Sequence, residues 1–121
     1  MKTLVVDDSM TMRRIIIKNL EALGFTDTVE AQDGETALAK MDETIDFVIT
    51  DWNMPGMNGL NLIKAIRSGP YKKVPILMVT TNATKDDVVA ALKAGANNYV
   101  TKPMTSAELQ AKITTIVNAR K

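Results

Sequence analysis

The sequence predicts an α/β fold: an open, doubly wound, five-stranded parallel sheet with five helices distributed over both faces. Short apolar runs alternate five times with amphipathic stretches, and strands alternating with helices of about 10 to 15 residues are typical of parallel sheets built from helical crossovers. Five such units are too few for an eight-stranded barrel. Several runs are apolar almost throughout, as in strands that are covered on both faces.

The expected strands are the five short apolar runs. The first, third and fourth are the most continuously apolar, which favours central positions in the sheet. Each run ends at polar residues, so each has a defined carboxyl end. The runs are Leu4–Val6, Thr28–Ala31, Ile45–Ile49, Pro75–Val79 and Asn98–Val100.

The first three helices are recognised from their apolar spacing and their ends. Gly24 is placed to end the first helix, in the position where glycine commonly follows a helix. Asp33 is an N-cap residue for the second, and the third begins at Asn58 or Gly59. The expected stretches are Met12–Leu23, Asp33–Met41 and Asn58–Arg67.

The last two helices have equally clear signals. Thr84 opens the fourth, which ends at Gly95. Thr105 and Glu108 have the spacing of a capping box at the start of the fifth. Apolar residues then recur on one face of that helix, at Leu109, Ile113, Ile116 and Val117.

Length and charge limit the functional classes. The chain of 121 residues and 13.2 kDa fits one domain, so we expect residues 1–121 to form a single domain with no output domain. Fifteen Lys and Arg against fourteen Asp and Glu give a net charge of +1. This balance argues against a nucleic-acid binder that depends on phosphate neutralisation.

The absence of two residue types is also informative. The chain has no Cys and no His, which excludes disulfides, thiolate zinc sites, His-based metal sites and Ser-His or Cys-His nucleophiles. Asp7 and Asp8 interrupt the only apolar run near the start, so no secretion signal is expected. No stretch is long and apolar enough for a membrane span. We therefore expect a cytoplasmic protein.

Acidic and hydroxyl residues follow the expected strands. In a parallel sheet these residues meet at the carboxyl edge, where ligands bind in such folds. Each residue taken alone is better explained as a helix cap or a solvated side chain. Three acids at ~5 Å would repel by roughly 3 kcal/mol per pair, so together they require a cation. The residues are Asp7, Asp8, Asp51, Thr80, Thr81, Thr101 and Lys102.

Carboxylates without His or Cys favour Mg²⁺, which implies phosphate chemistry. A carboxylate beside Mg²⁺ can attack a phosphoryl group, while a lysine and a hydroxyl stabilise the phosphoryl oxygens. Asp51, Lys102 and Thr80 fit these three roles. The residues alone leave open which acid is the nucleophile, although Asp51 ends a central strand and the adjacent acids Asp7 and Asp8 suit metal binding.

Five segments together resemble the receiver domains of two-component response regulators, particularly the stand-alone chemotaxis members. The resemblance covers the whole chain and is specific, because separated segments agree in order and spacing. It implies the flavodoxin-like strand order 2-1-3-4-5. The segments are Leu4–Ser9, Thr50–Pro55, Met57–Gly59, Val79–Thr80 and Tyr99–Pro103.

The resemblance also implies roles for individual residues. Asp51 would be the phosphoacceptor, and Asp7, Asp8, Asp51 and the Asn53 backbone carbonyl would hold Mg²⁺. A cis peptide bond before a proline, here Pro103, is compatible with the family, although cis is the minority form of such bonds.

A switch set is implied as well, formed by Thr80, Tyr99 and Lys102. Movement of Thr80 toward a phosphoryl group would let Tyr99 turn inward and repack the surface of the fourth helix, fifth strand and fifth helix. Without the resemblance, Tyr99 is better interpreted as a core aromatic with its hydroxyl at the rim. Asn53 and Asn82 occupy positions that influence phosphoryl lifetime in the family.

Several functions are compatible with these residues. The first is a monomeric, non-enzymatic switch, phosphorylated by a CheA-like histidine kinase, bound by a FliM-like flagellar motor switch protein, and open to the action of a phosphatase. The second is a phosphorelay intermediate that passes its phosphoryl group to another protein's His. A Mg²⁺ phosphatase is disfavoured because Asn53 replaces the second acid that would act as general acid. A flavin or nucleotide module is disfavoured because its phosphate would meet Asp7 and Asp8.

Overall fold

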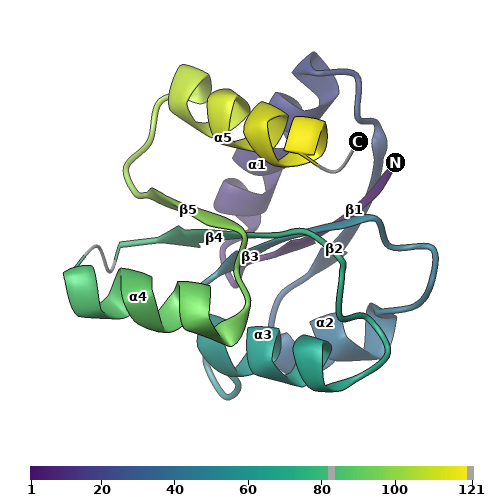
Figure 1. Cartoon of the computed structure of the whole chain (residues 1–121). Helices are drawn as coiled ribbons and strands as arrows, with labels where there is room; N and C mark the ends of the chain where they lie inside the picture. The colour runs from purple at the N-terminus through teal and green to yellow at the C-terminus, as the bar shows by residue number, and fades with distance from the viewer. Residues whose placement is uncertain (82–83, 120–121) are drawn as a thin grey trace.

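A computed structural model of the chain describes residues 1–81 and 84–119. Its centre is a parallel sheet in the order β2-β1-β3-β4-β5, and helices cover both faces (Figure 1). The predicted fold class and strand order are therefore confirmed. The strands are β1 (Lys2–Val6), β2 (Asp27–Ala31), β3 (Phe47–Asp51), β4 (Ile76–Thr80) and β5 (Asn98–Thr101).

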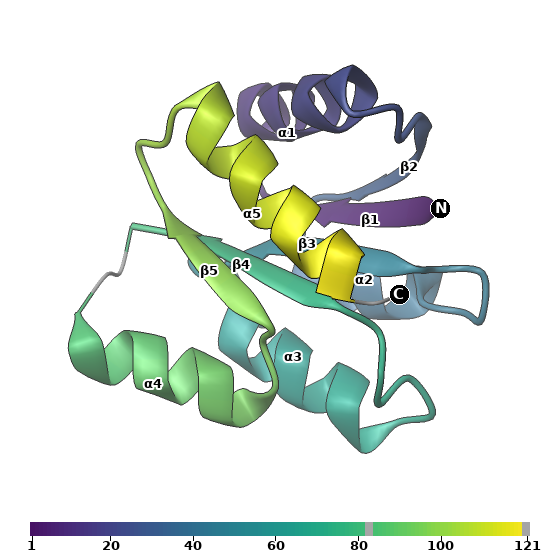
Figure 2. The same cartoon turned by 45° about the horizontal axis from the view of Figure 1, so that its top comes forward.

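The helices form two layers. Helices α1 and α5 lie on one face of the sheet, and α2, α3 and α4 lie on the other (Figures 1 and 2). This division follows from right-handed crossovers, because the step from β1 to β2 runs across the sheet in the opposite direction to the later steps from β2 to β3, β4 and β5. The helices are α1 (Met10–Ala22), α2 (Gly34–Lys40), α3 (Gly59–Ser68), α4 (Lys85–Ala94) and α5 (Ser106–Ala119).

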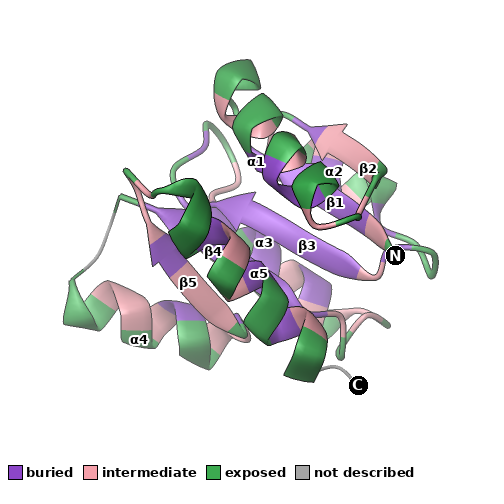
Figure 3. Cartoon of the chain, turned by 90° about the horizontal axis from the view of Figure 1, so that it is seen from above, coloured by how far each residue is buried: buried purple, intermediate pink, exposed green. Residues whose placement is uncertain are grey.

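Each face of the sheet has its own hydrophobic cluster. Alternate residues of a strand point to opposite faces, so Leu4 and Val48 belong to the α2-α3-α4 cluster, whereas Val5 and Ile49 belong to the α1-α5 cluster. All five residues of β3 are buried, and the strand runs through the centre of the molecule (Figure 3). The acid at its end is thereby placed on a rigid support.

A polar pair joins the two helices of the α1-α5 layer. The buried Asn19 donates to the Ile15 carbonyl at 2.8 Å and accepts a hydrogen bond from Gln110 at 2.8 Å. Buried amides are stable only when they are hydrogen-bonded. The pair therefore fixes the position of α5 relative to α1.

Several boundaries differ from the sequence prediction, including the start of β1, which lies at Lys2 rather than at Leu4. Helix α1 begins two residues earlier than expected, because the Ser9 hydroxyl caps it by accepting from the Met12 N–H at 3.2 Å. Helix α2 ends before Met41, whose backbone is extended and whose side chain is buried. Strand β3 begins at Phe47 rather than at Ile45, because the Asp46 carboxylate accepts the Lys2 N–H at 2.9 Å.

The predicted helix caps agree with the structure. Asp33, Asn58 and Thr84 each accept a hydrogen bond from a backbone N–H three residues ahead. Thr105 and Glu108 form the expected capping box, with the Glu108 N–H donating to the Thr105 hydroxyl at 3.1 Å. Within the described ranges, no helix has the length and apolar character needed to cross a bilayer.

Candidate functional site

Three acids meet at the carboxyl edge of the sheet. Asp7 and Asp8 follow β1, and Asp51 is the last residue of the neighbouring strand β3. One carboxylate oxygen from each lies within 4.8 Å of the other two. Asp7 and Asp51 are only 1% and 5% exposed, whereas Asp8 is exposed. The cluster therefore has a buried floor and one side open to solvent.

Lys102 supplies a positive charge to the buried acids. It follows β5, and its Nζ lies 3.1 Å from Asp7 Oδ2 and 3.3 Å from Asp51 Oδ2. Its backbone N–H donates to the Thr80 carbonyl at 2.8 Å, which fixes the chain beside β4. The Lys102–Pro103 peptide bond is cis. One lysine thus bridges two acids, and the cluster keeps a net negative charge.

Backbone groups hold the second oxygen of each buried acid. Asp7 Oδ1 accepts from the Ser9 N–H at 2.9 Å, and Asp51 Oδ1 accepts from the Trp52 N–H at 2.8 Å. Each carboxylate is therefore oriented by its own turn at one oxygen and by Lys102 at the other. This arrangement keeps the two Oδ2 atoms directed toward the same point.

Burial raises the pKa of the Asp51 carboxyl above its ordinary value, and the neighbouring charge of Asp7 raises it further. The charge of Lys102 and the hydrogen bonds from Lys102 and Trp52 act in the opposite direction. A raised pKa means that Asp51 is costly to ionise in the folded chain. A cation placed among the three acids would lower this cost.

The donor set fits Mg²⁺. Hard carboxylate oxygens are its preferred protein ligands, and Mg²⁺ usually keeps several waters in its coordination shell. Two buried acids with one exposed acid provide oxygen ligands and leave the solvent side open for water. The predicted grouping of Asp7, Asp8 and Asp51 is therefore present in the structure, while the identity of the metal stays a prediction.

The hydroxyl residues lie beside the acids on the same edge. Thr80 is the last residue of β4, is 2% exposed, and pairs with Thr101 of β5. The adjacent Thr81 hydroxyl accepts from the Asn53 side-chain amide at 3.3 Å. Asn82 lies outside the described residues. The roles predicted for Thr80 and Asn53 stay predictions.

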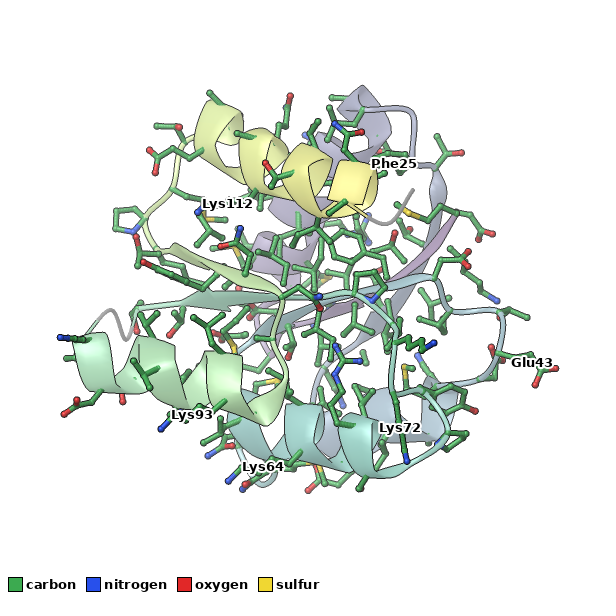
Figure 4. The ribbon with its side chains drawn as sticks, viewed as in Figure 1. Phe25, Glu43, Lys64, Lys72, Lys93 and Lys112 are labelled. Atoms are coloured by element: carbon green, nitrogen blue, oxygen red, sulfur yellow. The ribbon has the colours of Figure 1, made fainter. Side chains whose placement is uncertain are left out.

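Tyr99 lies on β5, away from the acids, and is partly buried. Lys112 of α5 places its Nζ 5.4 Å from the centre of the Tyr99 ring and 3.3 Å from Asn98 Oδ1. Figure 4 shows Lys112 between α5 and β5. A cation over an aromatic face is attractive, so Lys112 stabilises the present position of the ring.

Sequence reasoning missed Arg13 as a part of the site. Its Nη1 donates to the Asp7 carbonyl at 2.7 Å, and its Nε pairs with Glu30 of β2 at 3.0 Å. Arg13 therefore fixes the turn that carries Asp7 and Asp8. No sequence signal distinguishes it from the neighbouring Arg14, because only the three-dimensional arrangement brings α1, β1 and β2 together here.

Comparison with known proteins agrees with this geometry. The family model described as "Response regulator receiver domain" matches residues 3–114. The chain belongs to the response regulator receiver family. The resemblance identified from the sequence is therefore confirmed, and the acids lie where the receiver motifs predicted them.

Individual relatives of this receiver domain come from chemotaxis. "Chemotaxis protein CheY1" of Helicobacter pylori is 51% identical over 120 residues, covering 97% of each chain. "Chemotaxis protein CheY" of Pseudomonas aeruginosa is 51% identical over 115 residues, covering 93% of each. These names support assignment to the chemotaxis branch of two-component signalling switches.

Solved structures give the same result for the fold. The chemotaxis response regulator CheY4 of Vibrio cholerae has a TM-score of 0.88 at 34% identity, with 95% of this chain and 97% of that chain covered. The Francisella response regulator 1452 receiver domain has a TM-score of 0.86 at 28% identity, with 99% and 98% covered.

Proposed function

We propose that this receiver domain is a phosphorylation-activated switch in which Asp51 accepts a phosphoryl group from the phosphohistidine of a CheA-like kinase. The P–N bond of the phosphohistidine breaks as an Asp51 carboxylate oxygen forms the new P–O bond, and the departing imidazole keeps the electron pair. The observation that supports this best is the position of Asp51, a buried carboxylate at the end of the central strand, between two acids and a lysine.

The surrounding residues have complementary roles in this proposal. Asp7, Asp8, Asp51 and the Asn53 backbone carbonyl would hold Mg²⁺. When bound, Mg²⁺ neutralises charge on the transferring phosphoryl group. Lys102, already within 3.3 Å of Asp51 Oδ2, is placed to pair with a phosphoryl oxygen. The Thr80 hydroxyl, at the end of the next strand, would donate to another.

Phosphorylation would then change a surface. Movement of Thr80 toward the phosphoryl oxygens would allow Tyr99 to turn inward, against the attraction of Lys112 described above. The surface formed by α4, β5 and α5 would repack and bind a FliM-like motor switch protein. The chain would act as a cytoplasmic, monomeric receiver domain, and its phosphoryl group would be removed with the help of a phosphatase.

The alternative of a true phosphatase has less support. Such an enzyme needs a general acid near its nucleophile. Asn53 stands two residues after Asp51, and the nearby acids Asp7 and Asp8 belong to the proposed metal site. In this proposal the chain therefore promotes only its own phosphorylation and dephosphorylation.

Phosphorylation at Asp51 is testable with acetyl phosphate as a small phosphodonor. In the presence of Mg²⁺ we expect the intact mass to rise by one phosphoryl group, mapped to the peptide that contains Asp51. The Asp51→Asn variant should gain none, and EDTA should suppress the gain. Asp27→Asn, which changes an exposed acid at the far edge of the sheet, is the matched control and should behave like the wild type. An adduct that persists in Asp51→Asn would contradict the proposal.

Metal binding is testable by thermal unfolding. Because Mg²⁺ binds only the folded acid cluster, a concentration one hundred times the Kd should stabilise the fold by about 2.7 kcal/mol. Asp8→Asn removes an exposed ligand and should reduce the rise in Tm, whereas Asp27→Asn should keep it. The measurement is a melting series with increasing Mg²⁺, using Ca²⁺ for comparison. Equal responses from wild type and Asp8→Asn would argue against the site.

A further inference from the structure

The loop between β3 and α3, residues 52–58, carries the proposed metal ligand Asn53. Its base is closed by the Gly59 N–H, which donates to the Trp52 carbonyl at 2.8 Å. On one side the Asn53 amide reaches Thr81 at 3.3 Å. The position of the Asn53 carbonyl therefore depends on what holds the rest of this loop.

The other side of the loop rests on the start of α2. Glu35 Oε1 accepts a hydrogen bond from the Met57 N–H at 3.1 Å. Gly34 packs directly on Met57, since a Cβ on Gly34 would lie 2.9 Å from both the Met57 Cβ and the Met57 carbonyl oxygen. The first turn of α2 and the end of the loop are thus in close contact.

Gly56 completes this contact. Its φ of 74° is in the region that favours glycine, and an added Cβ would lie 3.0 Å from Glu35 Oε1. The carboxylate therefore lies against the most conformationally permissive residue of the loop. Glu35 itself is well fixed at its backbone, because Asp33 caps the same turn by accepting the Thr36 N–H at 2.7 Å.

We propose that Glu35 is a positioning residue for the metal site, whose carboxylate holds the loop of residues 52–58 so that the Asn53 carbonyl can bind Mg²⁺. The inference rests on the proposed function, and it adds a residue that does not touch the metal. An acid near Mg²⁺ can act through its negative charge or as a hydrogen-bond acceptor. In this proposal Glu35 acts as a hydrogen-bond acceptor. An amide with the same reach should replace it.

The experiment is a Mg²⁺ titration followed by the fluorescence of Trp52, the first residue of the loop, in wild type and two variants. Glu35→Ala removes the acceptor and should raise the Kd for Mg²⁺ on the order of fivefold, as expected for loss of one ordinary hydrogen bond. Glu35→Gln keeps the acceptor and should bind Mg²⁺ like the wild type. Glu21→Ala, which removes an exposed charge from α1, is the control for charge alone.

A second variant tests the same contact from the loop. Gly56→Ala should also weaken Mg²⁺ binding, and the double variant Glu35→Ala, Gly56→Ala should be little weaker than either single one, because residues in one contact are not additive. Melting without Mg²⁺ checks that all variants fold. Because Glu35 is exposed, its variants should keep the wild-type Tm in EDTA.

The outcomes distinguish this inference from the proposed function. If the wild type binds Mg²⁺ and Glu35→Ala binds equally well, the positioning role is wrong. If Glu35→Gln is as weak as Glu35→Ala, the effect is one of charge, and the positioning role is again wrong. If the wild type itself shows no response to Mg²⁺, the proposed metal site fails, and the inference fails with it.

Discussion

Replacing Gly59 by Ala is expected to lower the free energy of unfolding by about 3 kcal/mol, the upper range for adding an atom to a packed interior. A Cβ at this position would lie 2.1 Å from the Asp51 carbonyl oxygen and 2.9 Å from the Trp52 Cα. Both neighbours are backbone atoms, which cannot move aside as a flexible side chain can. Helix α3 would have to move away from the end of β3. Urea unfolding in EDTA measures the loss.

Gly69→Ala is the matched control. Gly69 ends the same helix with a negative φ, and an added Cβ would meet only carbonyl oxygens at 3.7 Å. This substitution should change the free energy of unfolding by less than about 1 kcal/mol, with stabilisation favoured by the smaller entropy of the unfolded chain. Equal stability of Gly59→Ala and Gly69→Ala would contradict the close approach of α3 to Asp51.

Lys102→Met should lower the free energy of unfolding by a similar amount. It keeps a long apolar stem but leaves Asp7 and Asp51 without their shared cation, and breaking a buried ion pair from one side costs about 3 kcal/mol or more. The loss should be largest in EDTA near neutral pH and should shrink when Mg²⁺ is added. Lys72→Met, at an exposed lysine on the surface beyond α3 (Figure 4), is the control and should leave stability unchanged.

The difference in stability between Lys102→Met and the wild type should depend on pH because of the Asp51 carboxyl. Its pKa is raised in the folded chain, so the folded state binds the proton more tightly than the unfolded state does. The stabilisation that comes from protonation of Asp51 is therefore present below the ordinary carboxyl pKa. It is lost as the pH rises through the pKa of Asp51 in the folded chain. The difference between Lys102→Met and wild type should narrow as pH falls toward 4. A constant difference across pH would mean that packing of the lysine stem, and not its charge, stabilises the fold.

Much of the fold could be predicted because its signals are local. The apolar runs became strands, and cap residues such as Asp33, Asn58 and Thr84 stand where the helices begin. The errors occurred where a side chain competes with the backbone for hydrogen bonds, as Asp46 does at the start of β3 and Ser9 does at the start of α1. Such competition depends on the partner strand or turn, which the chain alone does not indicate.

The site was predictable to the extent that topology brings strand ends together. Asp7, Asp8 and Asp51 were expected to meet, and they do. The supporting contacts were not expected, because Arg13, Glu35 and Gly59 act through backbone atoms of neighbouring turns and loops. Almost any residue type can supply a backbone carbonyl or N–H as a partner, so the sequence does not indicate such contacts. The residues that orient a site are therefore harder to identify than those that form it.

The two hydrophobic clusters have a consequence for communication across the molecule. Helices α4 and α5 flank β5 but belong to clusters on opposite sides of the sheet, and α5 is tied to α1 through Asn19 and Gln110. A protein that contacts both α4 and α5 therefore bridges two helix layers, each packed on its own hydrophobic cluster. Its affinity would depend on their relative displacement, so a slight shift of α4 alone would alter docking while α5 stays anchored and neither interior is disrupted.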